Sequence, residues 1–205
     1  MFPIKQEART KLTRRRIIAA AVPEFAAKGY AAASLNAICA QNLSKGLVYH
    51  NYKGKDDLYI ACVTHCFSDF LSAFRAAGNI PDLGTYMSVR LKYFREHPQE
   101  SRIIFEALLR PPAALAEEIA AARHDFDEFN RACFQSLIAR LTLRPGVTPE
   151  DAANYFTIMQ SLFNLHFGST ASAGENLPNL AAEHEKTLPK MLDLMLYGIV
   201  QRSDQ

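Results

Sequence analysis

Apolar residues in this chain recur with the spacing of a helix, and this spacing constrains the fold more than any other feature. Four of them, at i, i+3, i+4 and i+7, share one face of a helix expected over about residues 10–28: Ile18, Ala21, Val22 and Phe25. No stretch alternates apolar and polar residues over the length of a strand with β-branched enrichment. We therefore predict an all-α fold of about nine helices.

Prolines and glycines divide the chain into helical segments. Gly29 follows the basic Lys28 and ends the first helix, because glycine adopts the left-handed conformation found after a last turn. Pro23 lies inside that helix and predicts a kink, since proline removes one internal hydrogen bond. Further helices are expected at about 34–42, 44–52, 56–77, 82–96, 99–110, 112–141, 149–167 and 187–201, with a long mobile loop at 169–179.

Length and composition exclude several classes of protein. With 205 residues, 49% of them hydrophobic, the chain is long enough to bury a real core, so extensive disorder is excluded. The region that precedes the first helix has no apolar leader, and no apolar run approaches the length of a membrane span. The four cysteines lack the spacing of a disulfide scaffold: Cys39, Cys62, Cys66 and Cys133. We expect a cytoplasmic protein without a membrane partner.

The formal net charge of +2 is unevenly distributed. Residues 1–60 carry ten Lys and Arg against four Asp and Glu, whereas residues 61–205 carry thirteen against seventeen. A basic end is typical of a nucleic-acid surface, and it is equally typical of a tail that keeps a protein soluble. The charge alone leaves both readings open.

Two short helices joined by a tight turn are expected inside this basic end. Ser34 suits the N-cap of the first, Asn42 its end, and Ser44 the N-cap of the second. The second helix, within SKGLVYHNY, has an apolar anchor in Leu47 and Val48 and is otherwise too polar for a core. The major groove of DNA admits one such helix, so the pattern predicts a helix-turn-helix.

Three runs carry a resemblance to a known family: RRRIIAAAVPEFAAKGY, SLNAIC and LSKGLVYHNYKGKDDLY. Over about residues 12–60 they resemble the N-terminal domain of the TetR/AcrR transcriptional regulators. The resemblance implies a helix-turn-helix DNA-binding domain at 1–54 and a helical effector-binding and dimerisation domain at 55–205. The turn departs from the family's usual Ala-Gly-Val-Ser, because Gln41, Asn42, Leu43 and Ser44 form a turn one residue shorter.

The resemblance also implies which residues face double-stranded DNA. The third helix becomes the recognition helix, Tyr49 and Lys55 hold phosphates, Ser34 donates to a phosphate, and Asn36 reaches a base. The implied DNA-binding residues are Ser34, Asn36, Ser44, Lys45, Gly46, Leu47, Tyr49, His50, Asn51, Lys53 and Lys55.

A possible metal or thiol sensor lies farther along the chain. Spacings of three and four place Cys62, His65 and Cys66 on one helical face, but a fourth ligand is missing nearby. Buried cysteines more often act as small apolar residues, so packing is the favoured interpretation and no metal or other cofactor is predicted. No catalytic motif is present, and we predict that the protein is not an enzyme.

Residues 61–205 are rich in phenylalanine, and most of these rings must form the core. A bundle packed with large rings can also enclose an apolar cavity, with polar contacts from among Arg102, Asn130, Gln160, Asn164 and His166. In the TetR family such a cavity binds the inducer. The candidate ligand-binding residues are Phe67, Phe70, Phe105, Phe129, Cys133, Met159, Phe163 and His166.

The last predicted helix is apolar nearly all round. Between Leu188 and Val200 only Lys190 and Asp193 are charged, so two of its sides need burial. With the helix around 152–167 it predicts a symmetric interface between two copies. The prediction is thus a homodimeric repressor, released from a palindromic operator by a small, mostly apolar effector. The alternative is a helical enzyme or small-molecule carrier with an incidental basic N-terminus.

Overall fold

The computed structural model describes residues 3–40, 43–170 and 176–199. Within them the chain forms nine α-helices, one 3₁₀ turn and no strand, which confirms the all-α prediction. The elements are α1 (Pro3–Ala32), α2 (Leu35–Cys39), α3 (Lys45–Asn51), α4 (Lys55–Ala77), α5 (Leu83–Glu96), α6 (Pro98–Leu109), the 3₁₀ turn η1 (Ala113–Leu115), α7 (Ala116–Ile138), α8 (Pro149–Thr170) and α9 (Leu177–Ile199).

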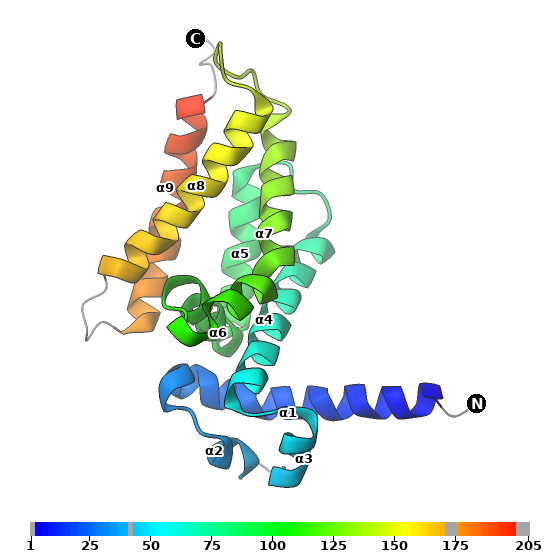
Figure 1. The fold of residues 1–205 in the computed structure, drawn as a ribbon. Helices are drawn as coiled ribbons and strands as arrows, with labels where there is room; N and C mark the ends of the chain where they lie inside the picture. Colours follow the sequence, from blue (N-terminus) through cyan, green and yellow to red (C-terminus); the bar gives the residue numbers. More distant parts are fainter. Residues whose placement is uncertain (1–2, 41–42, 171–175, 200–205) are drawn as a thin grey trace.

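The helices form a small N-terminal group joined to a larger bundle (Figure 1). Helix α1 lies across the base, with α2 and α3 beneath it and its N-terminal end projecting beyond them. Helix α4 rises from this base and packs against α1, α5, α6 and α7, while α8 and α9 lie together at the far side of the bundle. Contacts of α1 with both α4 and α6 connect the two groups.

One apolar core runs through both groups. Its buried residues include Ile17 and Phe25 of α1, Val48 of α3, and Phe70 and Ile104 of the bundle. Phe70 packs against four other rings, those of Phe74, Tyr93, Phe94 and Phe126. No helix among the described residues has the length and apolarity needed to cross a membrane.

The interruption in α1 lies at Gly29 and not at Pro23. Gly29 has φ 70° and ψ 169°, the only non-helical dihedral angles inside α1. This region of backbone space is open almost exclusively to glycine. Pro23 keeps helical dihedral angles, so the residue that interrupts α1 is Gly29, where the first helix was predicted to end.

We expect Gly29→Ala to lower the free energy of unfolding by about 1–3 kcal/mol, the typical cost of a strained backbone conformation. An added Cβ would also lie 2.8 Å from Oε1 of Glu106. Gly46→Ala is the matched control, because Gly46 is helical and nothing lies within 4 Å of its added Cβ. It should raise stability by roughly 0.5–1 kcal/mol. Urea unfolding followed by circular dichroism measures both, and equal effects would contradict the prediction.

Several helix boundaries differ from those predicted. Helix α1 begins at Pro3 and ends at Ala32, beyond the expected range of about 10–28 at both ends. Residues 112–141 form η1 followed by α7, rather than one helix. Helix α9 begins ten residues before the expected 187, because the carbonyl of Asn176 accepts the amides of Asn179 (3.0 Å) and Leu180 (3.2 Å). Pro178 fits this start, since the first turn needs no amide from it. The mobile loop expected at 169–179 is thus helical at both ends, and residues 171–175 lie outside the described residues.

Candidate functional site

Serine hydroxyls begin both short helices, as predicted. Oγ of Ser34 accepts the amide of Ala37 at 3.1 Å, and Oγ of Ser44 accepts the amide of Leu47 at 3.1 Å. Leu43, between the two helices, is buried. The turn residues Gln41 and Asn42 lie outside the described residues.

Helix α3 has one buried side and one exposed side. Val48 is buried and Leu47, half-buried, packs against the core. Asn51 is half-buried, and the side chains of Lys45, Tyr49 and His50 are exposed, that of Tyr49 to 57%. Four of the predicted DNA-facing residues on or next to α3 share this exposure with Tyr49: Ser44, Lys45, Gly46 and His50. Lys53, after α3, and Ser34 and Asn36, at the start of α2, are also exposed.

Arg14 of α1 holds the C-terminal end of α3. Its Nη2 donates to the carbonyl of Asn51 at 3.3 Å, and its guanidinium lies 5.0 Å from the centre of the Tyr52 ring. Burial raises the pKa of Tyr52, against the opposing charge of Arg14. Nδ2 of Asn51 donates to the carbonyl of Leu47 at 2.9 Å. Asn51 and Leu47 therefore stabilise α3 through this hydrogen bond, in addition to any contact with DNA.

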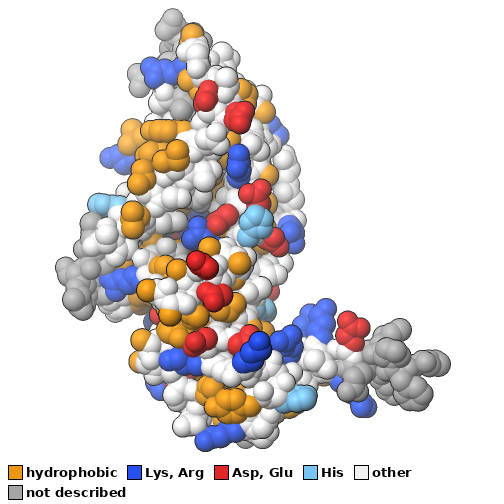
Figure 2. Space-filling model, viewed as in Figure 1, with side chains coloured by type: hydrophobic (Ala, Val, Ile, Leu, Met, Phe, Trp, Pro, Cys, Tyr) orange, Lys and Arg blue, Asp and Glu red, His pale blue; other side chains and the backbone are white. Residues whose placement is uncertain are grey.

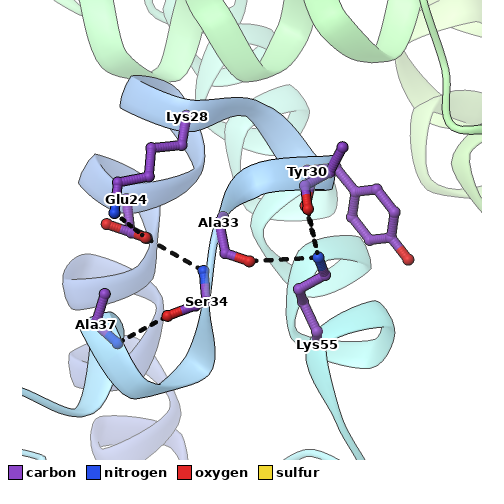
Figure 3. A network of polar contacts seen from close by, with 8 residues as sticks. Glu24, Lys28, Tyr30, Ala33, Ser34, Ala37 and Lys55 are labelled. Atoms are coloured by element: carbon purple, nitrogen blue, oxygen red, sulfur yellow. Dashed lines mark hydrogen bonds and ion pairs between the residues drawn. The ribbon is translucent and has the colours of Figure 1, made fainter.

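Lys55 is committed to the end of α1. Its Nζ donates to the carbonyls of Tyr30 (2.8 Å), Ala31 (3.1 Å) and Ala33 (3.3 Å), and two of these bonds are drawn in Figure 3. An ammonium has three protons, so these bonds leave none for the phosphate that the resemblance assigned to Lys55. The structure makes Lys55 a residue that closes α1 instead.

The same network positions Ser34 (Figure 3). Oε1 of Glu24 accepts the backbone amide of Ser34 at 3.2 Å and Nζ of Lys28 at 2.9 Å. The hydrogen bond from Lys28 lowers the pKa of Glu24, so this buried side chain stays ionised at neutral pH. The start of α2 is therefore fixed to α1 from two directions.

Glu106 of α6 joins three helices, and the sequence analysis missed it. Its carboxylate accepts the amide of Tyr30 at the end of α1 (2.9 Å) and the hydroxyl of Tyr59 on α4 (2.9 Å). Burial, then the charge of Glu106, raises the pKa of Tyr59 far above its usual value, so the hydroxyl remains a donor. The available signal was a lone acid inside the apolar run IIFEALL.

Basic side chains line α1 where it projects beyond α3. Figure 2 shows Lys and Arg side chains along this part of the molecule, and Arg9, Lys11, Arg15 and Arg16 are all exposed. The exposed side of α3 thus has a cationic neighbour.

A small cavity of about 30 Å³ lies in the bundle between α5, α6, α7, α8 and α9. Of the eight predicted ligand-binding residues only Cys133 lines it, together with the predicted polar contacts Asn130, Gln160 and Asn164. Phe67, Phe70 and Phe105 are buried in ring packing instead. The other four are not in the cavity wall either: Phe129, Met159 and Phe163 are half-buried, and His166 is exposed, as is Arg102 on α6.

A buried polar network forms part of the cavity wall. Nε and Nη2 of Arg90 both donate to the carboxylate of Glu185 at 2.7 Å. Nδ1 of His184 lies 3.0 Å from Oε1 of Glu185, and its Nε2 lies 3.0 Å from Oδ1 of Asn164. Burial lowers the pKa of His184, against the opposing effect of Glu185.

We expect the protein to lose stability as the pH falls from 7 towards 5, partly through His184. Its folded pKa lies below the unfolded value of 6.5, so its contribution is complete above 6.5 and is lost as the unfolded state gains a proton. Chemical denaturation at several pH values measures this slope. His184→Gln should flatten the slope, and an unchanged slope in this variant would contradict the assignment to His184.

The cysteines and histidine of α4 do not meet. Cys62 and Cys66 are fully buried, whereas His65 is exposed, so the shared face predicted for them is wrong. His65 and Cys66 are sequence neighbours, which a helix separates by about 100°. Burial raises the pKa of both thiols, as expected of packing residues. Within 3–40, 43–170 and 176–199 no group of three His, Cys, Asp or Glu side chains could hold a metal ion.

Comparison with protein-family models identifies the N-terminal part of the chain. The model described as bacterial regulatory proteins, tetR family, matches residues 17–62, which contain α2 and α3 and parts of α1 and α4. The N-terminal helix-turn-helix region therefore matches that of TetR-family transcriptional regulators. This sets aside the enzyme alternative. A comparison with curated proteins gave no match.

Solved structures share the TetR fold over nearly the whole chain. A TetR-family regulator from Pectobacterium atrosepticum is 20% identical with a TM-score of 0.63, over 96% of this chain and 98% of that one. A transcriptional regulator from Rhodococcus sp. Rha1 is 19% identical with a TM-score of 0.64, over 93% and 99%. The fatty acid degradation regulator FadR from Bacillus halodurans is 16% identical with a TM-score of 0.59, over 85% and 96%.

Proposed function

We propose that this protein is a homodimeric repressor of the TetR family that binds a palindromic DNA operator through α3 and is released by a small, mostly apolar ligand. Residues 1–54 would form the DNA-binding domain, and residues 55–205 the effector-binding and dimerisation domain. The observation that carries the proposal is the exposed polar side of α3, capped by Ser44 and anchored by Arg14 beside the basic part of α1.

The exposed residues divide into two roles on the DNA. Lys45, Tyr49 and His50 would enter the major groove, where Gly46 permits close approach of the backbone. Ser34, Asn36, Ser44 and Lys53 flank them, and serine hydroxyls and lysines typically bind phosphates. Leu47, Asn51 and Lys55 would act by holding α3 and the end of α1 in position.

Dimerisation would use the outer faces of α8 and α9. Figure 2 shows hydrophobic side chains gathered over these helices. Single exposed apolar residues are common on a monomer, but a cluster on two adjacent helices marks an interface. The exposed residues are Tyr155, Ile158, Leu162, Leu165, Leu194 and Tyr197. A two-fold interface there would present two copies of α3 to half-sites about 34–36 Å apart.

Release of the operator by the ligand would act through α6. Leu108 of α6 lines the cavity, and Glu106 of the same helix holds the end of α1. A ligand that enlarges the cavity would shift α6, move α1 with it, and change the separation of the two α3 helices. This is a population shift between operator-competent and operator-incompetent dimers.

Selection of bound sequences from a random duplex pool tests the proposal. We expect a two-fold symmetric site with half-sites one DNA turn apart, and an affinity that falls steeply as salt rises. An affinity that ignores ionic strength, or a selected site without symmetry, would contradict it.

Lys45→Ala should weaken operator binding about 10-fold and relax base preference, because its amine stands on the groove-facing side of α3. Lys92→Ala, at an exposed position on α5, is the matched control and should bind as wild type. Fluorescence anisotropy with selected and scrambled duplexes at several salt concentrations measures both. Equal losses in the two variants would show that α3 is not the reading helix.

A further inference from the structure

The cavity wall contains a buried hydrogen-bond donor that has no partner among the residues that the structure describes. Asn130 of α7 is 2% exposed, and its Oδ1 accepts the hydroxyl of Tyr86 at 2.9 Å. Its Nδ2 makes no hydrogen bond, although Asn130 lines the cavity. A buried amide proton without an acceptor costs free energy, so in a native protein such a group calls for an acceptor, which a water or a ligand can supply.

The charges around the cavity are already balanced. Arg90 and Glu185 neutralise each other, because Nε and Nη2 of Arg90 donate two hydrogen bonds of 2.7 Å to the carboxylate of Glu185. His184 is buried with a lowered pKa, which favours the neutral ring at pH 7. An anionic ligand would therefore be buried here without a counter-ion, at a large desolvation cost.

The remainder of the wall is largely apolar. It consists of leucine, methionine and phenylalanine side chains from five helices: Leu83, Leu108, Phe126, Phe134, Leu137, Phe156, Leu188, Met191 and Leu192. A ligand that fits this wall needs a mostly hydrocarbon surface with few polar atoms.

We propose that the effector is an uncharged, mostly apolar molecule whose carbonyl oxygen accepts the Nδ2 proton of Asn130. The ligand class is ketones, esters and amides, in contrast to carboxylates. This inference rests on the proposed function, of which it specifies the effector.

The cavity has a volume of about 30 Å³. It has room for about one or two water molecules, far below the roughly 300 Å³ of a small-molecule site. Binding therefore requires wall side chains to move, and Met191 is the most adaptable of them because methionine has three rotatable bonds. An effector that forces this expansion would also push on Leu108, which connects the cavity to α6.

Calorimetric titration of the full chain tests the ligand class with three matched series. The probes are acetophenone and its para-alkyl derivatives, the corresponding benzoates, and the corresponding ethylbenzenes. We expect the ketones to bind at least about 10-fold more tightly than either matched series, the factor that one well-formed buried hydrogen bond supplies.

Variants then test the anchor itself. Asn130→Leu should weaken ketone binding about 10-fold and leave ethylbenzene binding unchanged, because only the ketone has an acceptor. Gln135→Leu, an exposed amide on the same helix, should change neither. Asn130→Leu also deprives Tyr86 of its acceptor, so a double variant with Tyr86→Phe removes both groups, and circular dichroism confirms that each variant is folded.

The inference is overturned if benzoates bind more tightly than ketones, or if no ketone binds up to its solubility limit. It is also overturned if Asn130→Leu weakens the binding of ketones and of ethylbenzenes equally. Unchanged ketone binding in Asn130→Leu would show that Nδ2 holds only a water. Operator binding by the wild type, measured in the same samples, separates the two proposals. If ketones fail but another compound releases the operator, only the ligand class is wrong, whereas absence of operator binding contradicts the proposed function.

Discussion

Replacing Leu162 and Leu165 together by Asp is expected to produce a monomer that binds the operator at least about 100-fold more weakly than wild type. Both side chains lie on the outer face of α8, 53% and 64% exposed. In the proposed dimer they would be buried against a second copy, where unpaired carboxylates are strongly unfavourable. A monomer also loses the effective concentration that the second half-site provides, typically a factor of about 10² or more.

Sedimentation velocity measures the oligomeric state, and fluorescence anisotropy with a full operator measures the affinity. Leu91→Asp is the matched control, because Leu91 is 47% exposed on α5 and is not one of the exposed apolar residues of α8 and α9 that form the proposed interface. It should remain dimeric and bind normally. A dimeric double variant, or a monomer that binds the full operator as tightly as wild type, would contradict the proposed interface.

Arg90→Met should lower the free energy of unfolding by about 3–5 kcal/mol, the typical cost of removing one partner of a buried ion pair. Arg90 and Glu185 are 3% and 8% exposed. Burial alone would raise the pKa of Glu185, but Arg90 and the hydrogen bond from His184 outweigh it and hold the pKa at about 2. Without Arg90 the carboxylate would have to take up a proton or remain buried as an uncompensated charge.

The double variant Arg90→Met with Glu185→Leu should recover most of this loss, because no buried charge remains. Lys186→Met is the control for removing a cation from α9, since Lys186 and Glu183 form a pair with side chains 74% and 60% exposed. Such surface pairs contribute little to stability. Urea unfolding at a fixed protein concentration measures all three, and an Arg90→Met effect no larger than that of Lys186→Met would refute the argument.

The pH dependence of the pair has a definite sign. The folded pKa of Glu185 lies below its ordinary value of 4.5, so its contribution is complete above 4.5 and is lost as the pH falls towards 2. The loss that begins nearer pH 6.5 belongs instead to His184. The contributions of Glu185 and His184 to stability are therefore lost over different pH ranges, although the two side chains are in contact.

The sequence by itself determined the features that depend on residues within one helical turn. The caps at Ser34 and Ser44, the buried Val48 and the polar outer side of α3 all follow from local spacing, and the structure has each of them. Such features are predictable because a cap or an amphipathic face involves residues at most four apart in the chain.

The tertiary structure alone decided which side chains were still available for a ligand. Lys55 and Tyr30 are 25 residues apart, Glu106 and Tyr30 are 76 apart, and Arg90 and Glu185 are 95 apart. Local spacing carries no information about such pairs, so it could not show that Lys55 is engaged by α1. The cavity is the extreme case, because Phe67, Phe70 and Phe105 were expected to line it but pack against other rings instead. The position of a cavity depends on small packing mismatches where helices meet.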